Sequence, residues 1–172
     1  MGLDMYLYKK TYVKNWDFKQ DSPKHYVSVK VDGKMRQDIK PERITYIEEE
    51  VAYWRKFNAL HGYIVENHAG GVDECQDIRL ELSDLELILE TLKEVIKSKP
   101  DEEGVVTEGA PKPEDLLPPT EGFFFGSYEV DEYYYQDVEN TIEELQKLVD
   151  ETSAANEEYG LWGSEFIYRA SW

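Results

Sequence analysis

Apolar residues alternate with polar residues at both ends of the chain, and this alternation constrains the fold more than any other feature. Every second residue is apolar in two short runs, one near each terminus: Leu3, Met5 and Leu7, and then Phe166, Tyr168 and Ala170. A period of two is typical of a β-strand that buries one of its faces. We therefore expect a strand at each end of the chain.

Three further segments favour strands. Alternating valines stop at Asp32-Gly33, a pair suited to a tight turn, so residues 27–39 predict a β-hairpin. Residues 78–82 alternate in the same way as the terminal runs. The three phenylalanines at residues 123–125 come before a glycine, which predicts a short buried strand followed by a turn.

The first helical pattern covers residues 41–67. Pro41 fits the first turn of a helix, where its missing N–H group costs nothing. Apolar side chains then follow at spacings of three and four residues as far as Val65. The pattern ends near Gly70-Gly71, so the sequence predicts one long helix that begins at the proline.

Two more helices are expected later in the chain. Ser83 and Glu86 match a capping box, and they predict an amphipathic helix that opens at Ser83, carries an apolar stripe from Leu85 to Ile96 and has Lys93, Lys97 and Lys99 near its end. Asp131 is suited to cap a third helix, which carries an apolar stripe on one side and acids on the other.

Strands at both ends and three helices between them indicate an α+β fold. We expect a single domain over residues 1–172, with a mainly antiparallel sheet that contains both terminal strands and about three helices packed on one face. Residues 100–121 hold five of the seven prolines and many acids. This composition predicts a flexible excursion from the domain rather than a domain boundary.

The net charge of −18 is spread unevenly along the chain. Residues 1–50 carry a balance of +1, whereas residues 51–172 carry −19. A surface this acidic repels phosphates, so we expect no direct binding of nucleic acid. Two interpretations remain: the acids keep the protein soluble, or they resemble a polyanion to a partner protein with a basic groove.

Several familiar sites are not indicated by the sequence. It lacks the motifs of phosphate-binding loops, dinucleotide-binding turns, zinc proteases and serine hydrolases. One short segment holds four side chains of metal-binding types: His68, Asp73, Cys75 and Asp77. Their spacing matches no zinc pattern, so we expect no metal and no cofactor. With one cysteine, no secretory leader and no apolar run long enough to span a membrane, a cytoplasmic protein is expected.

Polar side chains lie on the apolar side of the first predicted helix. Trp54, Asn58 and His61 share a face at helical spacing, and Arg55 lies at its edge. This set could hold a planar, nucleotide-like ligand, with Arg55 binding an anion, Asn58 orienting the ligand and His61 serving as acid or base. Alternatively, Asn58 and His61 are core residues whose polar atoms bond to neighbouring segments.

A second candidate site lies at the start of the third predicted helix. Only one or two of Tyr133, Tyr134 and Tyr135 can face the core. The others would display their rings among acids, as interface anchors do, unless the helix start simply packs on the sheet. The acids assigned to this interaction surface are Glu132, Glu139, Glu143 and Glu144.

Four separated motifs occur in one order: GLDMYLY (residues 2–8), YWRKFNALHGY (53–63), GVDEC (71–75) and GFFFGSYEVDEYYYQD (122–137). Together they resemble a family of small proteins of tailed bacteriophages and prophages, over residues 2 to about 149. The resemblance implies a bacterial cytosol during infection or lysogeny, and an accessory role rather than a part in building the virion. It implies no particular reaction, although the second motif includes all four candidate ligand-binding residues.

These observations lead to two hypotheses. The first is a non-enzymatic accessory protein that binds a host or phage protein through the acidic, aromatic surface, as a nucleic-acid mimic or as an inhibitor of a host defence or nucleic-acid enzyme. Such binding should weaken steeply with salt. The second is a small-molecule binder or small enzyme with a pocket around Trp54, Arg55, Asn58 and His61.

Overall fold

The centre of the protein is a four-stranded antiparallel sheet with the strand order β4-β1-β6-β5. The structure is a computed structural model that describes residues 2–18, 21, 23–160 and 164–172. The strands are β1 (Asp4–Tyr12), β4 (Tyr46–Arg55), β5 (Ile78–Leu80) and β6 (Ser164–Ser171). The two terminal strands, β1 and β6, form the central antiparallel pair of the sheet.

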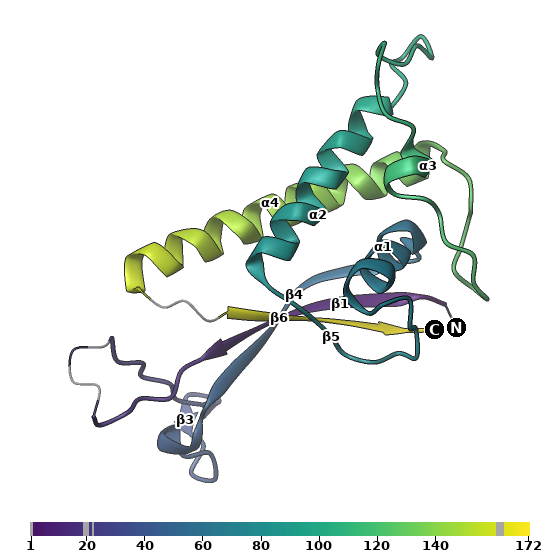
Figure 1. Cartoon of the computed structure of the whole chain (residues 1–172). Helices are drawn as coiled ribbons and strands as arrows, with labels where there is room; N and C mark the ends of the chain where they lie inside the picture. Colours follow the sequence, from purple (N-terminus) through teal and green to yellow (C-terminus); the bar gives the residue numbers. More distant parts are fainter. Residues whose placement is uncertain (1, 19–20, 22, 161–163) are drawn as a thin grey trace.

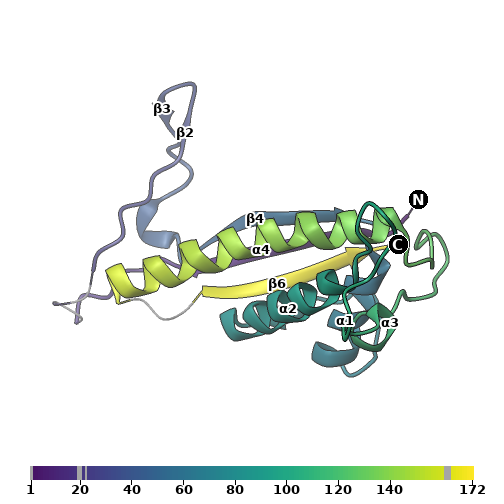
Figure 2. The same cartoon turned by 90° about the horizontal axis from the view of Figure 1, so that it is seen from above.

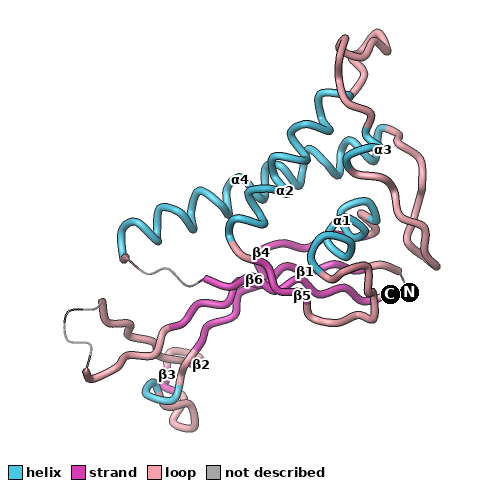
Figure 3. The backbone as a smooth tube through the Cα atoms, viewed as in Figure 1, coloured by secondary structure: helices cyan, strands magenta, loops and turns pink. Residues whose placement is uncertain are grey.

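Helices cover one face of this sheet (Figure 1; Figure 3). The helices are α1 (Asn58–His68), α2 (Leu82–Val95), α3 (Pro113–Leu116) and α4 (Glu132–Tyr159), with 3₁₀ turns at Pro41–Arg43 and Ile96–Ser98. The long helix α4 packs against α2, while α1 and α3 lie toward the end of the sheet where both chain termini are found. The predicted α+β fold, with both terminal strands in one sheet and helices on one face, is therefore confirmed.

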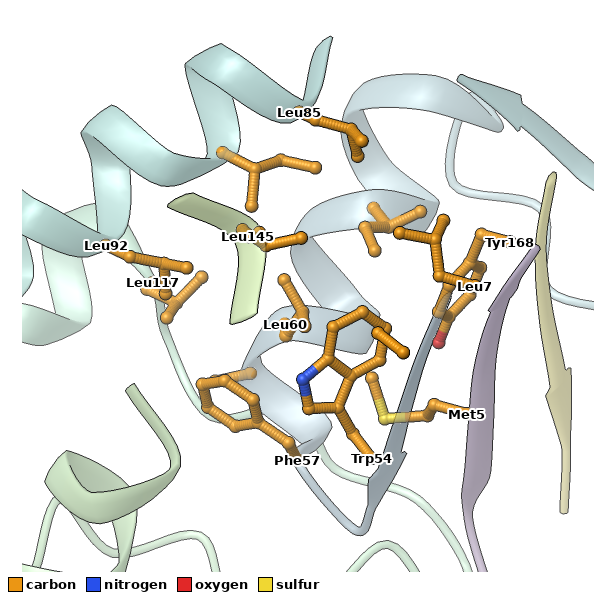
Figure 4. Close-up of a cluster of buried hydrophobic side chains, with 14 of the residues drawn as sticks. Met5, Leu7, Trp54, Phe57, Leu60, Leu85, Leu92, Leu117, Leu145 and Tyr168 are labelled. Carbon is orange, nitrogen blue, oxygen red and sulfur yellow. The ribbon is translucent and has the colours of Figure 1, made fainter. Parts of the chain in front are cut away.

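The hydrophobic core fills the space between the sheet and the helices (Figure 4). The alternate residues Leu3, Met5 and Leu7 of β1 are at most 1% exposed, so the alternation at the N-terminus marks a buried strand face as predicted. From the helices, Leu92 and Leu145 enter the same cluster. Each side chain of this size contributes roughly 1.5–3 kcal/mol when it is fully buried.

The prediction of a helix over residues 41–57 is wrong. Residues 46–55 form β4, and the helix begins only at Asn58. A β-bulge accounts for the difference: Leu7 of β1 pairs with Ala52, whereas its neighbour Tyr8 pairs with Glu50, so Val51 is left without a partner.

The bulge also explains why β4 resembles a helix in the sequence. An extra residue moves the alternation of a strand by one position, so the side chains that face inward no longer keep a period of two. In β4 the inward positions change from odd to even numbers across Val51, from Ile47 to Trp54. The resulting apolar spacing imitates the three- and four-residue steps of a helix.

The ends of the two long helices show one correct and one incorrect prediction. Asp131 caps α4 as predicted, because its carboxylate accepts a hydrogen bond from the backbone N–H of Tyr134 at 3.0 Å. The capping box of α2 is formed by Glu81 and Asp84, two residues before the predicted pair. Strand β5 ends at Leu80, and its pairing with β6 sets where the helix can begin.

Residues 23–45, here called the arm, contain a β-hairpin and the 3₁₀ turn Pro41–Arg43, and they lead into β4. The hairpin pairs β2 (Lys30–Val31) with β3 (Lys34–Met35) around Asp32-Gly33, whose φ angles of 47° and 79° match the predicted tight turn. Figure 2 shows the hairpin projecting away from the sheet, at the end of the protein opposite the two termini.

The segment at residues 100–121, predicted as an excursion, is irregular apart from α3. It runs over the same end of the sheet as α1 (Figure 1). None of the helices in the described part of the chain combines the length and the apolar composition that crossing a membrane requires.

Candidate functional site

The four predicted ligand-binding residues do not share a helix face. Trp54 and Arg55 lie on β4, where the Trp54 ring is buried in the core and the Arg55 guanidinium pairs with Asp4 at 3.3 Å. Asn58 and His61 lie in the first turn of α1. Arg55 and Asn58 border a small cleft of about 220 Å³, whereas His61 borders a separate, larger cleft. The prediction of one common helical face is therefore wrong.

Asn58 is buried, and both the nitrogen and the oxygen of its side-chain amide are hydrogen-bonded. The amide nitrogen donates to the carbonyl oxygens of Phe125 at 3.1 Å and Ser127 at 2.8 Å. The amide oxygen accepts from the backbone N–H of Thr120 at 3.0 Å. One side chain thus fastens two turns of the segment 120–127 to the start of α1, which satisfies the rule that buried polar groups have partners.

His61 is also buried, and both of its ring nitrogens are bonded. Nδ1 lies 2.7 Å from the hydroxyl of Tyr168 in β6, and Nε2 lies 2.9 Å from Oδ2 of Asp73. The other carboxylate oxygen of Asp73 accepts from the indole N–H of Trp172 at 3.3 Å. The ring of Phe125 meets the imidazole edge-on at a centroid distance of 5.2 Å.

The directions of the hydrogen bonds in the series Asp73–His61–Tyr168 are set by which atoms can donate. A carboxylate can only accept, so Nε2 of His61 donates to Asp73, and in this tautomer of the imidazole Nδ1 is the acceptor. The Tyr168 hydroxyl then donates to Nδ1. Burial, together with the charge of Asp73, raises the pKa of Tyr168 well above its usual value, so the hydroxyl keeps the proton that it donates.

The cleft beside His61, here called the cleft, has a volume of about 660 Å³. It lies between α1, α3, the segment 118–125 and the C-terminal Trp172. Two contacts hold its wall in place. One is the set of hydrogen bonds from Asn58, and the other is the close approach of Thr120 to Gly62, where an added Cβ atom would lie 1.8 Å from the threonine hydroxyl.

Acids and aromatic rings dominate the lining of the cleft. The carboxylates are those of Glu66, Asp73, Asp115 and Glu121. The rings belong to Tyr63, Phe123, Phe125 and Trp172. Among the described residues, no Lys or Arg borders it. A concave surface with this lining attracts a cation, because carboxylates supply charge and the faces of aromatic rings are electronegative.

The lip of the cleft carries an exposed pair of rings, and the predicted buried strand at residues 123–125 does not form. Phe123 is 81% exposed and Phe124 is 46% exposed, and only Phe125 turns into the core. Phe124 has a φ of 69°, a left-handed conformation that a bulky residue adopts at a cost of roughly 1–2 kcal/mol. Such strain is concentrated at functional loops, and here it presents apolar surface next to the acids.

The second predicted site, at the start of α4, is only partly on the surface. Tyr134 and Tyr135 are buried, and their hydroxyls donate to the carbonyl oxygens of Leu117 at 2.8 Å and Ser98 at 3.1 Å. Tyr133 is 75% exposed. Of the three tyrosines in the predicted interaction surface, the structure therefore leaves one available to a partner.

The acids predicted for this surface lie outside the core but differ in their electrostatic surroundings. Lys99 pairs with Glu132 at 3.3 Å and with Glu139 at 3.0 Å. Glu143 and Glu144 are exposed, and neither has an ion-pair partner in the described part of the chain. Of the four predicted acids, the two without an ion-pair partner therefore lie toward the middle of α4 rather than beside the exposed Tyr133.

One acid of α4 lies in an unfavourable environment. Asp137 borders the small cleft that also includes Arg55 and Asn58. Burial, and to a lesser degree the neighbouring charge of Asp131, raises the pKa of Asp137 to about 6. The group is therefore an acid that the fold keeps covered at some cost.

The four side chains of metal-binding types, His68, Asp73, Cys75 and Asp77, do not come together, and the His68 imidazole lies 3.8 Å from the Asp84 carboxylate. Asp73 is bonded to His61 and Trp172, while Asp77 accepts two hydrogen bonds from the Arg169 guanidinium in β6. Cys75 is exposed. Within the described ranges, no three His, Cys, Asp or Glu side chains are placed to hold a metal ion.

The sequence indicated His61 and Asn58 as candidates and singled out Asp73 only as a metal-binding type, and it did not indicate that Asp115 and Glu121 line the same cleft as His61. Asp115 and Glu121 lie in a segment without periodicity, and Trp172 lies about fifty residues after them in the sequence. The one available signal was a concentration of acids and aromatic residues near the first helix and in the segment before the third.

Comparisons with protein-family models, curated proteins and solved structures gave no match to this chain.

Proposed function

We propose that this chain is a non-enzymatic binding protein that recognises a basic partner protein by taking a Lys or Arg side chain into the cleft. One observation carries the proposal: four carboxylates and four aromatic rings line a cleft of about 660 Å³, without a Lys or Arg among its described lining residues. This volume lies in the range of about 300–1,000 Å³ that is usual for ligand sites. The exposed rings of Phe123 and Phe124 favour an apolar neighbour beside the cation.

Binding is favoured over catalysis by the state of His61. General acid–base chemistry needs a ring nitrogen within reach of the reacting group. Both nitrogens of His61 are occupied by Tyr168 and Asp73, and its side chain is only 2% exposed. The role of the imidazole that fits this geometry is to orient the Asp73 carboxylate, which is 28% exposed, toward the cleft.

The wider setting supports a partner protein rather than a small metabolite. The net charge of −18 attracts basic surfaces from a distance, which raises association rates more than it raises affinity. The resemblance to proteins of phages and prophages is consistent with an accessory protein that acts in the bacterial cytosol. A host or phage protein with a basic, partly apolar segment fits both the charge and the cleft.

A second candidate function is mimicry of a polyanion by the outer face of α4. This helix carries nine Asp or Glu and one Lys. At 1.5 Å per residue, the 28 residues of α4 give a charged face roughly 40 Å long. Polyanion mimicry needs the acids of this face and not those of the cleft, so the two candidates can be separated by experiment.

The test is the binding of a labelled peptide that alternates Val and Lys, followed by fluorescence anisotropy. The cleft variant replaces Asp115 and Glu121 by Lys, and the matched control replaces Glu143 and Glu144 by Lys. Both variants change the net charge equally, and all four side chains are exposed. We expect the cleft variant to weaken binding at least about tenfold and the α4 control to weaken it less than about threefold, because cations recognise nearby carboxylates.

A control peptide with norleucine in place of Lys should not bind. If the α4 control weakens binding more than the cleft variant does, polyanion mimicry replaces the cleft as the function. If the wild-type protein does not bind the basic peptide at low salt, both candidates are wrong.

A further inference from the structure

The arm of the protein has the opposite character to the cleft. Residues 23–45 contain six Lys or Arg and three Asp or Glu, so the arm carries +3 in a chain of −18. Lys30 and Lys34 are exposed on the β2–β3 hairpin, and neither side chain has a hydrogen-bond or ion-pair partner in the described part of the chain. The arm is thus a basic projection from an acidic body.

Apolar side chains accompany these lysines. In the hairpin, Lys30 pairs with Met35, and Val31 pairs with Lys34. Directly opposed residues share a face of a two-stranded ribbon, so each face presents one Lys beside one apolar side chain. Val31 is 51% exposed and Met35 is 42% exposed. This is the combination that the acids and the exposed phenylalanines of the cleft are suited to receive.

The arm and the cleft of one molecule are far apart. Figure 1 and Figure 2 both place the β2–β3 hairpin at one end of the sheet, and α1, α3 and the two termini at the other end. The arm joins the body through the adjacent strands β1 and β4. An arm that enters a cleft must therefore come from another molecule.

We propose that a second copy of this chain is a partner of the cleft, with the β2–β3 hairpin of one copy placing Lys30 or Lys34 between the acids of the next. The inference rests on the proposed function, since it names an occupant for the same cleft. The contact joins two different surfaces, so it is heterologous and generates a head-to-tail chain unless the rotation between copies closes a ring. A basic segment of another protein competes with the arm for the cleft.

The ionic conditions decide how this contact is observed. Two bodies of high negative charge repel each other at low ionic strength, whereas at about 0.1 M salt the Debye length of about 10 Å restricts the interaction to local groups. At about 1 M salt the length falls to about 3 Å, and the contact between Lys and carboxylate is screened as well. Association is therefore expected at intermediate salt and lost at high salt.

Sedimentation velocity on the full chain tests the proposal. Protein concentrations up to about 1 mM are used, because a contact made by one two-stranded hairpin is small and therefore weak. The arm variant carries Lys30→Glu and Lys34→Glu, and the cleft variant carries Asp115→Lys and Glu121→Lys. We expect the wild type to associate at about 0.1 M salt, and each variant alone to remain monomeric. In an equal mixture of the two variants, the basic arm of one meets the acidic cleft of the other, and the acidic arm meets the basic cleft. Association should therefore return in the mixture although neither variant associates alone.

The chain that carries all four substitutions provides a rescue. Its arm is acidic and its cleft is basic, so association should return. A wild type that stays monomeric at every concentration overturns the proposal, and so does an arm variant that associates as the wild type does. If the wild type is monomeric but binds the Val–Lys peptide through the cleft, the proposed function stands and the inference about the second copy fails. If neither association nor peptide binding is observed, both fail.

Discussion

The two ends of the protein hold their polar groups in different ways. At the cleft end, the side chain of Asn58 makes three hydrogen bonds and that of His61 makes two, to residues as far as 107 positions away in the sequence. At the arm end, Lys30 and Lys34 extend from a two-stranded hairpin into solvent. The cleft is built from tertiary contacts, whereas the hairpin is built mainly from local ones.

This difference determines what a substitution can change. In the cleft, the groups that orient a ligand also hold the segments 71–73 and 120–127 against α1, so binding and stability change together. In the arm, the charged groups contribute little to folding, so binding can change alone. The acids at the cleft rim, which are exposed, should behave like the arm rather than like His61. Substitutions at the two ends are therefore expected to affect stability and binding differently.

The largest effect is expected for His61→Ala. The change leaves a cavity between Phe125 and Tyr168 and removes a partner from both the Tyr168 hydroxyl and Asp73. Aromatic-to-alanine changes in a core cost about 3–5 kcal/mol, and a lost buried partner adds to this. We expect the free energy of unfolding, measured in urea, to fall by about 3–5 kcal/mol or more.

Tyr168→Phe is the matched control for His61→Ala, because it keeps the ring and removes only one hydrogen bond. We expect a loss of about 1–2 kcal/mol for this variant. A loss below about 1 kcal/mol for His61→Ala would show that the buried imidazole and its hydrogen bonds do not stabilise the fold.

Asn58 and His61 also show how far the sequence could predict this site. Apolar spacing correctly indicated that both side chains face the interior, and it correctly located the terminal strands, α2 and α4. The partners that explain the burial of Asn58 and His61 could not be predicted in the same way. Asp73 and Thr120 lie in irregular segments, and Tyr168 lies in a strand more than a hundred residues away.

The error over β4 has a similar origin. A local pattern cannot show that Val51 is the extra residue of a bulge, because a bulge is defined by the strand that pairs with it. The terminal strand β1 supplies that pairing from outside the segment. The sequence therefore predicts elements with regular periodicity, and it fails where two distant segments together set the register or build a cleft.

The second largest effect is expected for Gly62→Ala, where two principles predict opposite signs. In an exposed helix, this change is favourable by about 1 kcal/mol. Here the new Cβ would lie 1.8 Å from Oγ1 and 2.9 Å from Cβ of Thr120, so the wall of the cleft must move. We expect a net loss of about 1–3 kcal/mol and weaker peptide binding.

Combining Gly62→Ala with Thr120→Gly removes the clash and should restore part of the stability. If Gly62→Ala alone raises the melting temperature and leaves peptide binding unchanged, the close packing of α1 against the cleft wall is not required.

A smaller effect is expected at Asp137, which is a covered acid at the cleft end. Its pKa in the folded protein is raised to about 6, so the folded state binds the proton more tightly than the unfolded chain does. The contribution of this group to stability is fully present below its unfolded pKa and is lost as the pH rises through about 6.

Asp137→Asn should therefore stabilise the protein by about 1–2 kcal/mol at pH 8 and by roughly half as much at pH 5, a figure reduced for partial exposure. Thermal unfolding at a series of pH values measures this difference. A difference between the two proteins that does not grow with pH would contradict the raised pKa. Glu143→Gln, on the exposed face of the same helix, is the control for the loss of one acidic side chain.

The smallest effect on stability is expected in the arm. Lys30→Glu with Lys34→Glu reverses two charges that have no partner in the described structure, so the free energy of unfolding should change by less than about 0.5 kcal/mol. The Asp32-Gly33 turn and the backbone pairing that shape the hairpin remain. A loss above about 1 kcal/mol would mean that the lysines stabilise the fold, and the contrast between the two ends would then fail. Unchanged stability with lost association would instead show that the charges of the arm act only between molecules.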